Sequence, residues 1–574
     1  MITTHAPYIR HTRRRFLTAA AVVAGNAVLA ACGVEVQIPT ATPGIPATVT
    51  PLPVPTRAAL VAVNNTATAS ATATVAVTGA QSTTVPPATT TITARAATVA
   101  RPVGNATATN SRSTAPASAA STMRGTTTAV TTTTTAPAQT SGRAVTLRIA
   151  RFGNAQTATY EQGLYADFHT QHPEITLQVY PVDTPDWNGY LDQIEGQIRA
   201  GRGPDAVYVA TEAAQALAAQ GLATPLDPYV QRDREVLREY FADVAPVLVE
   251  AMLYDGHLYE LPSDFNAPTL FYNTARFRER GVPAPTGQWT QADFTAAMDK
   301  LTERNATPRR YGYAWTNRLF GGALPWFAAN GGNLLTQEHF PGGDWLWSTF
   351  YPKDAAARGR GGGYRWAQST ANRAANVEAL QFLVDLTYRS GAAPVPPAAD
   401  SLQQEVITLF GSKQLAVFPS GAYSVSQLKN AGIGPGDYDV TPFPRGKYLR
   451  PQFGTAGYAM LDSSPNKDAV WEFLKYRVRK EVIAATVKGG ASTPTRRSLA
   501  NTQLWTAELG PKHWQVFYDA LDTAPEAAPL PAPPLANAIT TVFTDAIDRA
   551  MNRRETPQAA LDRLNNDIAG ILSR

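Results

Sequence analysis

The chain has almost no cysteine and lacks the residue patterns that common catalytic centres need. One cysteine, Cys32, occurs in 574 residues, so no disulfide forms within the chain and thiol chemistry is excluded beyond this residue. The seven histidines show no His-Glu-x-x-His or other metal-ligand spacing. Phosphate-loop and Gly-x-Ser-x-Gly motifs are also missing. We therefore expect no metal and no cofactor. The sequence does not exclude a pair of carboxylates that hydrolyses glycosides.

Long hydrophobic runs are missing as well. The apolar run at residues 17–31 is about fifteen residues long, too short to cross a bilayer core of about 30 Å. It follows Arg13, Arg14 and Arg15 and ends in small residues just before Cys32, which is typical of a cleaved secretory signal. This arrangement resembles the lipobox of bacterial lipoproteins, in which the cysteine is acylated and becomes the mature N-terminus. The alternative is an apolar cysteine in an ordinary signal peptide.

The export route is suggested by residues 12–17 (TRRRFL), which resemble a twin-arginine signal. The chain departs from that pattern at Thr12, where serine is usual, and at Thr18, where lysine is frequent. General secretion is the alternative. We expect residues 1–31 to be removed and the protein to be exported and anchored through a lipid on Cys32 to the outer face of the cell membrane.

Aromatic residues are absent between residues 39 and 142, where nearly all positions are Thr, Ala, Val, Pro, Ser or Gly. Such a composition buries too little apolar surface to offset chain entropy, so we expect a disordered tether over residues 32–143. Residues 1–143 also hold ten of the 50 basic residues and one of the 45 acidic residues. The rest of the chain is then slightly acidic, with 40 basic against 44 acidic residues, and no nucleic-acid partner is expected.

The remaining part, residues 144–574, is too long for one compact core and suggests two domains. Its first segments alternate between β-rich and helical patterns, which predicts a parallel sheet with right-handed crossovers. The predicted strands are 145–150, 175–179 and 206–210, and the predicted helices are 157–171 and 192–200. Ligands bind such sheets beyond the carboxyl ends of the strands, here residues 151–154 and 211–212.

Several motifs then follow in a familiar order. They are 203–207 (GPDAV), 221–227 (GLATPLD), 255–262 (DGHLYELP) leading to 270–273 (LFYN), 289–294 (WTQADF), 413–421 (KQLAVFPSG), 438–444 (YDVTPFP) and 469–474 (AVWEFL). Together they resemble the extracellular solute-binding proteins of ABC importers, specifically the sugar-binding group that includes the maltose-binding protein. The resemblance covers essentially all of residues 145–574.

The resemblance implies an α/β fold of the two-lobed periplasmic-binding-protein type II, with hinge crossovers between the lobes. Lobe 1 is expected at about 144–263 and 452–500, and lobe 2 at about 266–450 and 501–574. The implied crossovers lie near 262–268, near 450–455 and after Arg497. Residues 338–366 depart from the family as a long insert. Within it, residues 361–363 are three glycines that predict a flexible loop.

The resemblance also implies a function without catalysis. The protein would capture a mono- or oligosaccharide between its lobes and deliver it to ABC permease subunits, acting as a monomer. A sugar needs aromatic rings for its C–H faces and charged or amide groups for its hydroxyls. Groups of these kinds at strand ends, crossovers and family positions give the expected ligand-binding set: Asn154, Glu212, Asp264, Asn266, Trp315, Tyr423, Gly454 and Arg496.

Some of these residues have structural alternatives. Glu212 is equally a carboxylate at a helix N-terminus. For Asp264 the alternative is a turn or cap residue, and ligand contact is favoured over it. Arg496 is equally a partner in a salt bridge. Trp345, Trp347 and Trp366 either cap the cleft or anchor the insert.

Three alternatives to sugar uptake stay open. The first is a surface glycosidase that uses two carboxylates. The second keeps the fold but binds a polyamine, a glycerol phosphodiester or a peptide. The third is a sensor that presents its ligand to a membrane receptor.

Overall fold

The computed structural model describes residues 144–184, 186–397, 402–488, 492–500, 510–522 and 527–574. The predicted signal at 1–31, Cys32 and the predicted tether at 32–143 lie outside the described residues and stay predictions. Within the described ranges, no helix combines the length and the apolar character that crossing a membrane requires.

The first of two main sheets defines lobe 1. Its strand order is β14-β6-β13-β3-β1-β2, and β15 pairs with the start of β13. The strands are β1 (Val145–Phe152), β2 (Ile175–Val182), β3 (Ala206–Ala210), β6 (Asp264–Asn266), β13 (Gln452–Met460), β14 (Thr493–Pro494) and β15 (Ala528–Pro529). The predicted parallel arrangement is correct for β1, β2 and β3. Strand β13, which the sequence analysis does not predict as a strand, runs antiparallel to β3 and β6, so the sheet as a whole is mixed.

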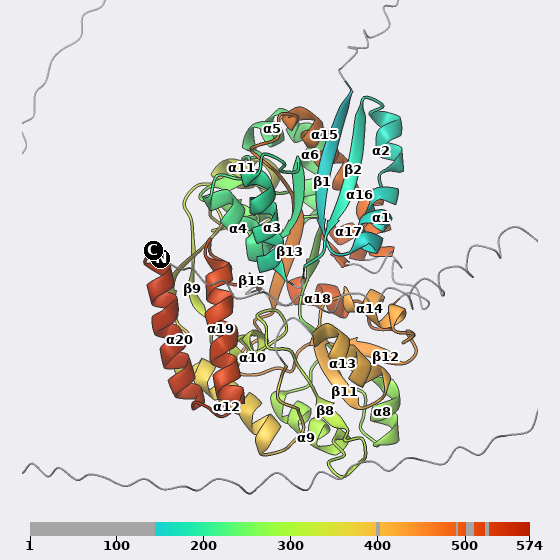
Figure 1. The fold of residues 1–574 in the computed structure, drawn as a ribbon, viewed down its shortest axis with the longest axis vertical. Coiled ribbons are helices and arrows are strands. Elements are labelled where there is room, and N and C mark those ends of the chain that lie inside the picture. Colours follow the sequence, from blue (N-terminus) through green and yellow to red (C-terminus); the bar gives the residue numbers. More distant parts are fainter. Residues whose placement is uncertain (1–143, 185, 398–401, 489–491, 501–509, 523–526) are drawn as a thin grey trace, which may run out of the picture. The chain divides into compact units, whose positions relative to one another are not determined.

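Helices cover this sheet, and Figure 1 shows α1 and α2 beside β2. They are α1 (Ala155–Gly163), α2 (Ala166–Gln171), α3 (Trp187–Arg199), α4 (Thr211–Ala219), α5 (Asp227–Arg232), α6 (Arg234–Asp243), α7 (Pro246–Glu250), α15 (Lys467–Arg477) and α16 (Lys480–Lys488). The helix predicted at 157–171 is two helices, since Gly163 weakens the helix and Tyr165 turns into the core, where it is 2% exposed. The helix predicted at 192–200 begins at Trp187, because Asp186 caps it by accepting a hydrogen bond from the Gly189 amide.

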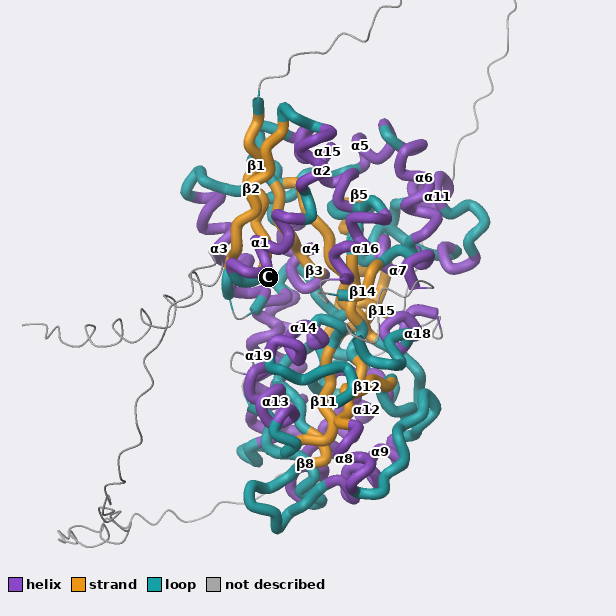
Figure 2. Tube along the Cα trace, turned by 90° about the vertical axis from the view of Figure 1, so that its right-hand side faces the viewer, coloured by secondary structure: helices purple, strands orange, loops and turns teal. Residues whose placement is uncertain are grey.

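The second main sheet defines lobe 2. It has the order β12-β7-β11-β8, with strands β7 (Thr269–Asn273), β8 (Tyr311–Tyr313), β11 (Leu415–Ser420) and β12 (Tyr438–Thr441). Figure 2 shows β8, β11 and β12 with α8 and α13 around them. The helices of this part are α8 (Thr274–Glu279), α9 (Gln291–Leu301), α10 (Leu324–Ala329), α12 (Ala374–Tyr388), α13 (Leu402–Gly411) and α14 (Ser424–Asn430).

The chain passes between the two sheets at short connections. Strand β6 of lobe 1 ends at Asn266, and β7 of lobe 2 begins three residues later at Thr269. The chain returns after β12 through residues 442–451 and enters lobe 1 with β13 at Gln452. After α17 (Arg497–Ala500) and α18 (Val516–Asp522), β15 pairs with β13, and α19 (Ala536–Met551) and α20 (Pro557–Leu572) then pack on α12.

The insert between α10 and α12 forms an ordered subdomain. Strands β9 (Leu335–His339) and β10 (Tyr364–Ser369) pair as an antiparallel hairpin, whose tip holds α11 (Asp344–Phe350) and a short 3-10 helix, η2 (Ala355–Ala357). The tip packs on lobe 1, where the rings of Phe350 and Phe241 stack 4.1 Å apart.

The structure corrects one expectation about this insert and decides between two alternatives for its tryptophans. Gly363 packs against the backbone of lobe 1 and has φ +109°, and a Cβ added to it would lie 2.2 Å from the Leu253 carbonyl oxygen. The glycine run at 361–363 is therefore a close backbone contact and not a flexible loop. Trp347 and Trp366 are 7% and 6% exposed, so both anchor the insert rather than cap a cleft.

Candidate functional site

Three of the predicted ligand residues meet where β3 passes into α4. Glu212 is the second residue of α4, so its carboxylate lies at the positive end of the helix dipole. On β13, Gly454 stands opposite Asn266 of β6. A Cβ on Gly454 would lie 3.5 Å from Glu212 Oε2, so the backbone there passes close to the carboxylate. Lobe 1 therefore presents a carboxylate, an amide and an open stretch of backbone side by side.

The predicted aromatic residue of lobe 2 meets this group through Gly421. A Cβ added to Gly421 would lie 2.8 Å from Asn266 Oδ1 and 2.7 Å from Tyr423 Cε1. Asn266 and Tyr423, from different lobes, are thus neighbours across a backbone position that only glycine fits. The structure brings together Glu212, Asn266, Tyr423 and Gly454, four of the eight predicted residues.

A fifth member of this cluster, Arg318, is not predicted from the sequence. Its Nη2 donates a hydrogen bond to the Tyr423 hydroxyl over 3.0 Å. Its positive charge also lies close enough to Glu212 to lower the pKa of that carboxyl. The ring of Phe320 lies beside Tyr423, with centroids 6.0 Å apart. The sequence does place a cation and an aromatic ring, Arg318 and Phe320, shortly after β8. In that region Trp315 was predicted as the stacking residue, and the pair was not.

Opposing effects set the ionisation of Glu212. Burial raises its pKa, while its own backbone amide, the Thr211 hydroxyl and Arg318 act in the other direction. Burial dominates, so the pKa of Glu212 lies above the ordinary value for a glutamate. A partly desolvated carboxylate of this kind binds hydroxyl donors strongly, because it has lost competing water.

The buried side-chain oxygen of Asn266, Oδ1, has no hydrogen-bond partner within the described part of the chain. It lies in the cluster, beside Gly421 and Tyr423. Because buried polar atoms are usually hydrogen bonded in native proteins, this oxygen is suited to accept a hydrogen bond from a bound hydroxyl or a water.

The other predicted residues have different surroundings. Trp315 is 1% exposed, so its ring offers no face for stacking. Asp264 is 4% exposed and accepts hydrogen bonds from the Tyr208 hydroxyl at 2.9 Å and the Ser263 hydroxyl at 3.1 Å. It lies two residues before Asn266 on the same side of β6, and burial raises its pKa. Asp264 therefore belongs to the interior of lobe 1.

Asn154 and Arg496 have structural roles that account for their positions. The exposed Asn154 caps α1 by accepting a hydrogen bond from the Thr157 amide at 3.1 Å. Arg496 is 4% exposed, and its guanidinium pairs with Asp243 at 2.8 Å and with Glu239 at 2.6 Å. The expectation that Arg496 binds ligand is not supported, because internal partners occupy its guanidinium.

An aromatic pair at the carboxyl end of β1 is also not predicted from the sequence. Phe152, the last residue of β1, stacks on Trp187, the first residue of α3, with centroids 4.4 Å apart. Both side chains are half-buried, and Trp187 also approaches the ring of Tyr208 on β3. The sequence places residues 151–154 at a ligand-facing strand end, but it gives no reason to prefer Phe152 over Asn154.

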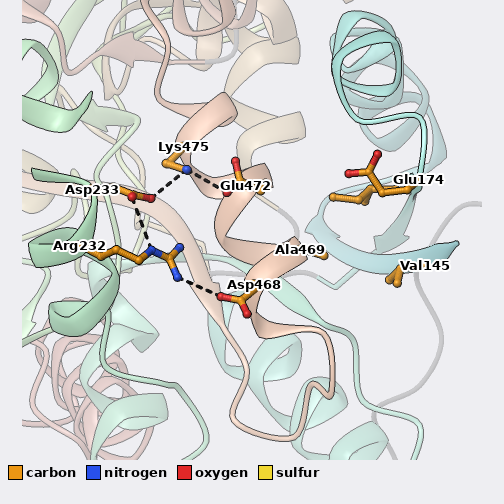
Figure 3. Close-up of a pocket in the computed structure, with 9 residues that line it drawn as sticks. Val145, Glu174, Arg232, Asp233, Asp468, Ala469, Glu472 and Lys475 are labelled. Carbon is orange, nitrogen blue, oxygen red and sulfur yellow. Dashed lines mark hydrogen bonds and ion pairs between the residues drawn. The ribbon is translucent and has the colours of Figure 1, made fainter. Parts of the chain in front are cut away.

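The pocket of about 470 Å³ drawn in Figure 3 lies elsewhere on lobe 1. It includes Val145, the first residue of β1, and so lies at the opposite end of that strand from Phe152. Its charged groups pair with each other: Arg232 with Asp468 at 3.1 Å, and Lys475 with Asp233 at 2.9 Å. A second pocket, of about 640 Å³, lies between α5 and the tip of the insert beside Trp345. Among the described residues, no group of His, Cys, Asp and Glu side chains is arranged to hold a metal ion.

Comparison with known proteins gives consistent matches. A family model described as bacterial extracellular solute-binding protein matches residues 153–483, more than half of the chain. The maltotriose-binding protein of Pyrococcus abyssi is 28% identical over 294 residues, which are 50% of this chain and 53% of that protein. The chain thus spans about half the length of this relative. A putative binding protein of Brucella abortus is 21% identical over 359 residues, 62% of this chain and 77% of that protein.

Solved structures agree with the fold. An ABC substrate-binding protein of Listeria monocytogenes, solved with cycloalternan, has a TM-score of 0.61 at 21% identity and covers 75% of this chain and 99% of its own. A maltose-bound MalE3 of T. maritima has a TM-score of 0.59 at 17% identity, with coverages of 74% and 99%. These likenesses confirm the predicted two-lobed α/β fold.

Proposed function

The chain belongs to the bacterial extracellular solute-binding protein family, and from this premise we propose that it captures a carbohydrate and delivers it to an ABC permease. The capture site we propose is the cluster of Glu212, Asn266, Gly454, Tyr423 and Arg318, with Phe152 and Trp187 as further stacking candidates. One observation carries the proposal: lobes 1 and 2 both contribute to the cluster, which is where a two-lobed binding protein closes on its ligand.

The chemistry of the cluster suits a neutral polyhydroxylated ligand. Tyr423 and Phe320 offer ring faces for C–H groups, while Glu212 and Asn266 offer acceptors for hydroxyl donors. Arg318 offers donors for hydroxyl oxygens, and its charge offsets that of Glu212. A polyamine would face Arg318 as a like charge, and a phosphodiester would face Glu212 in the same way. A sugar meets neither repulsion.

The relatives support the same class of ligand. One relative is named for maltotriose, and two structural neighbours were solved with cycloalternan and with maltose. These ligands are oligosaccharides, and we extend that class, without choosing a member of it, to this chain.

We propose binding without turnover. The relatives matched above are described as binding proteins. Glycoside hydrolysis needs two carboxyl groups that face the same bond. Of the two carboxyl groups described near the cluster, Glu212 lies beside Arg318 and Asp264 is held inside lobe 1 by Tyr208 and Ser263. This arrangement favours recognition over acid–base catalysis.

The extracellular character of the family fits the proposed signal and anchor. We propose that cleavage exposes Cys32, that its acylation holds the protein at the outer face of the membrane, and that residues 32–143 act as a tether. We propose that the protein works as a monomer and that its transport partner is a pair of permease subunits.

A thermal-shift screen tests the function directly, since a ligand that binds only the folded state raises the melting temperature. The protein is the mature chain with Cys32→Ser, and the panel holds mono- and oligosaccharides, polyols, spermidine and glycerophosphodiesters. We expect stabilisation by at least one carbohydrate, confirmed by calorimetry. Stabilisation by spermidine or a phosphodiester alone would show that the ligand is a polyamine or a phosphodiester and not a carbohydrate. Release of a chromophore from aryl glycosides would instead establish an enzyme.

A further inference from the structure

The insert joins the two lobes at a place separate from the crossovers. We call residues 335–369 the strap; they comprise β9, α11, η2 and β10. The strap leaves lobe 2 after α10 and returns to it at α12, but its tip packs on α6 and α7 of lobe 1. The chain therefore makes two further passes between the lobes, beyond those at residues 267–268 and 442–451 and the passage from β15 to α19. Figure 1 draws β9 beside α19 and α20.

A buried amide fixes the base of the strap in lobe 2. Asn376 of α12 is 0% exposed, and its Nδ2 donates hydrogen bonds to the carbonyl oxygens of Asn333 and Thr370, both at 2.9 Å. The Thr370 amide in turn donates to the Leu334 carbonyl oxygen at 2.9 Å. Both arms of the hairpin are thus held together at the point where they leave lobe 2.

A buried carboxylate fixes the tip of the strap on lobe 1. Glu250, the last residue of α7, is 0% exposed and accepts hydrogen bonds from three groups of the strap. These are His339 Nδ1 at 2.7 Å, Arg360 Nη1 at 2.6 Å and the Gly361 amide at 2.8 Å. A carboxylate buried this completely is tolerated only while such partners stay in place. Separating the tip from lobe 1 would therefore break three hydrogen bonds to a carboxylate at once.

The segment between these two fixed points is a paired ribbon that touches the helix that carries Glu212. Strands β9 and β10 pair from His339 opposite Tyr364 to Leu335 opposite Ser369, with a register shift between Trp366 and Ser369. Gln215 of α4, one helical turn beyond Glu212, donates a hydrogen bond to the Tyr364 carbonyl oxygen at 2.7 Å. A paired ribbon cannot lengthen as a single extended chain can, because its ladder of hydrogen bonds would break.

We propose that the strap limits how far the two lobes separate and thereby slows ligand exchange. Hinge rotation about the crossovers moves Glu250 relative to Asn376, and the ribbon between them must bend or release one end. The lobe with Glu212 thus stays near Arg318 and Tyr423 even without ligand. The effect on exchange rests on the proposed function, whereas the limit on opening does not.

The test compares the distance between the lobes in ligand-free proteins. In the mature chain with Cys32→Ser, the exposed Ser463 of lobe 1 and Ser412 of lobe 2 are replaced by cysteine for spin labelling. Arg360→Gln removes a charged partner of Glu250. Arg365→Gln is the matched control, because Arg365 is also on the strap but has its charged partner, Glu338, on the strap itself. We expect a wider distance distribution for Arg360→Gln and an unchanged one for Arg365→Gln.

Ligand kinetics give the second readout. With a carbohydrate found in the thermal-shift screen, Arg360→Gln should raise the dissociation rate by about tenfold, which corresponds to a modest lowering of the barrier. His339→Gln, a milder change at an exposed position, provides the same test if Arg360→Gln does not fold. Identical ligand-free distances in folded Arg360→Gln or His339→Gln and in the parent would overturn the proposal. Since the distance measurement contains no ligand, a protein that binds no sugar would still test the strap.

Discussion

Arg318 donates a hydrogen bond to the phenolic oxygen of Tyr423 over 3.0 Å, which ties a residue the sequence does not single out to the aromatic residue it favours most. Arg318 also lies close enough to Glu212 of the other lobe for its charge to oppose the burial that raises the pKa of Glu212. An aromatic ring, a guanidinium and a carboxylate thus form one cluster.

Replacing Tyr423 with alanine should weaken carbohydrate binding. The change removes a stacking face, for which we expect a loss of about 0.5–1.5 kcal/mol, and it also frees Arg318 from its oriented position. Tyr423→Phe should retain the stacking and lose less. Isothermal titration calorimetry measures both. Tyr448→Ala serves as the control, since Tyr448 is 51% exposed. Equal affinity of Tyr423→Ala and Tyr448→Ala would remove Tyr423 from the site.

Glu212→Gln should weaken binding and stabilise the free protein. Loss of a charged acceptor costs about 1.5–3 kcal/mol of affinity when hydroxyls bind to it. The folded-state pKa of Glu212 is raised by burial, so its contribution to folding is greatest when it is protonated, at low pH, and is lost as the pH rises through that pKa. At neutral pH the uncharged amide of the variant avoids this loss, and a gain of about 0.5–2 kcal/mol is expected. Urea unfolding at several pH values measures it.

The affinity for carbohydrate should fall as the pH falls, whereas the contribution of Glu212 to folding stability rises. As the pH falls through the raised pKa of Glu212, the carboxylate becomes protonated and loses an acceptor for sugar hydroxyls, so binding weakens. Glu212→Gln should show a flat profile in that range, while Glu481→Gln, at an exposed position on α16, should behave as the parent. A parent profile that matches the Glu212→Gln profile would show that Glu212 does not contact the ligand.

Arg496→Gln should destabilise the fold without changing the affinity of the folded protein. The change leaves Asp243, whose side chain is 15% exposed, without its guanidinium partner, and breaking such a buried pair costs about 3–5 kcal/mol. Arg497→Gln is the neighbouring control, since Arg497 is 44% exposed and only 3.5 Å from Asp354. Denaturant unfolding gives the stability and calorimetry the affinity. A stable Arg496→Gln protein that no longer binds carbohydrate would show that Arg496 belongs to the ligand site.

Cys32→Ser should release the protein from the membrane and leave its ligand affinity unchanged. Fractionation of cells measures the release, and calorimetry on the soluble form measures the affinity. Retention of the variant in the membrane fraction would show that the anchor lies elsewhere. Weakened binding by the soluble variant would contradict the proposed separation between anchor and ligand site.

The sequence predicted strand β3 correctly, but its predictions for one helix and for one glycine run were wrong. Strand β3 begins and ends as predicted, because its five apolar or aromatic residues are all buried and adopt one conformation. The helix predicted at 157–171 is wrong as a single element, since the inward turn of Tyr165 depends on packing that no local pattern contains. The glycines at 361–363 have the composition of a flexible loop, and only the neighbouring backbone of residues 253–256 makes them a fixed contact.

By itself, the sequence determined the family, the alternation of strands and helices, and four members of the candidate site: Glu212, Asn266, Tyr423 and Gly454. These follow from local patterns and motif order. Only the tertiary structure decided that Arg318 joins them, that internal carboxylates occupy Arg496 and that the insert crosses to lobe 1. Each of these outcomes depends on which distant residue lies beside which, and that neighbour is set by the packing of the two lobes, which no local pattern of residues contains.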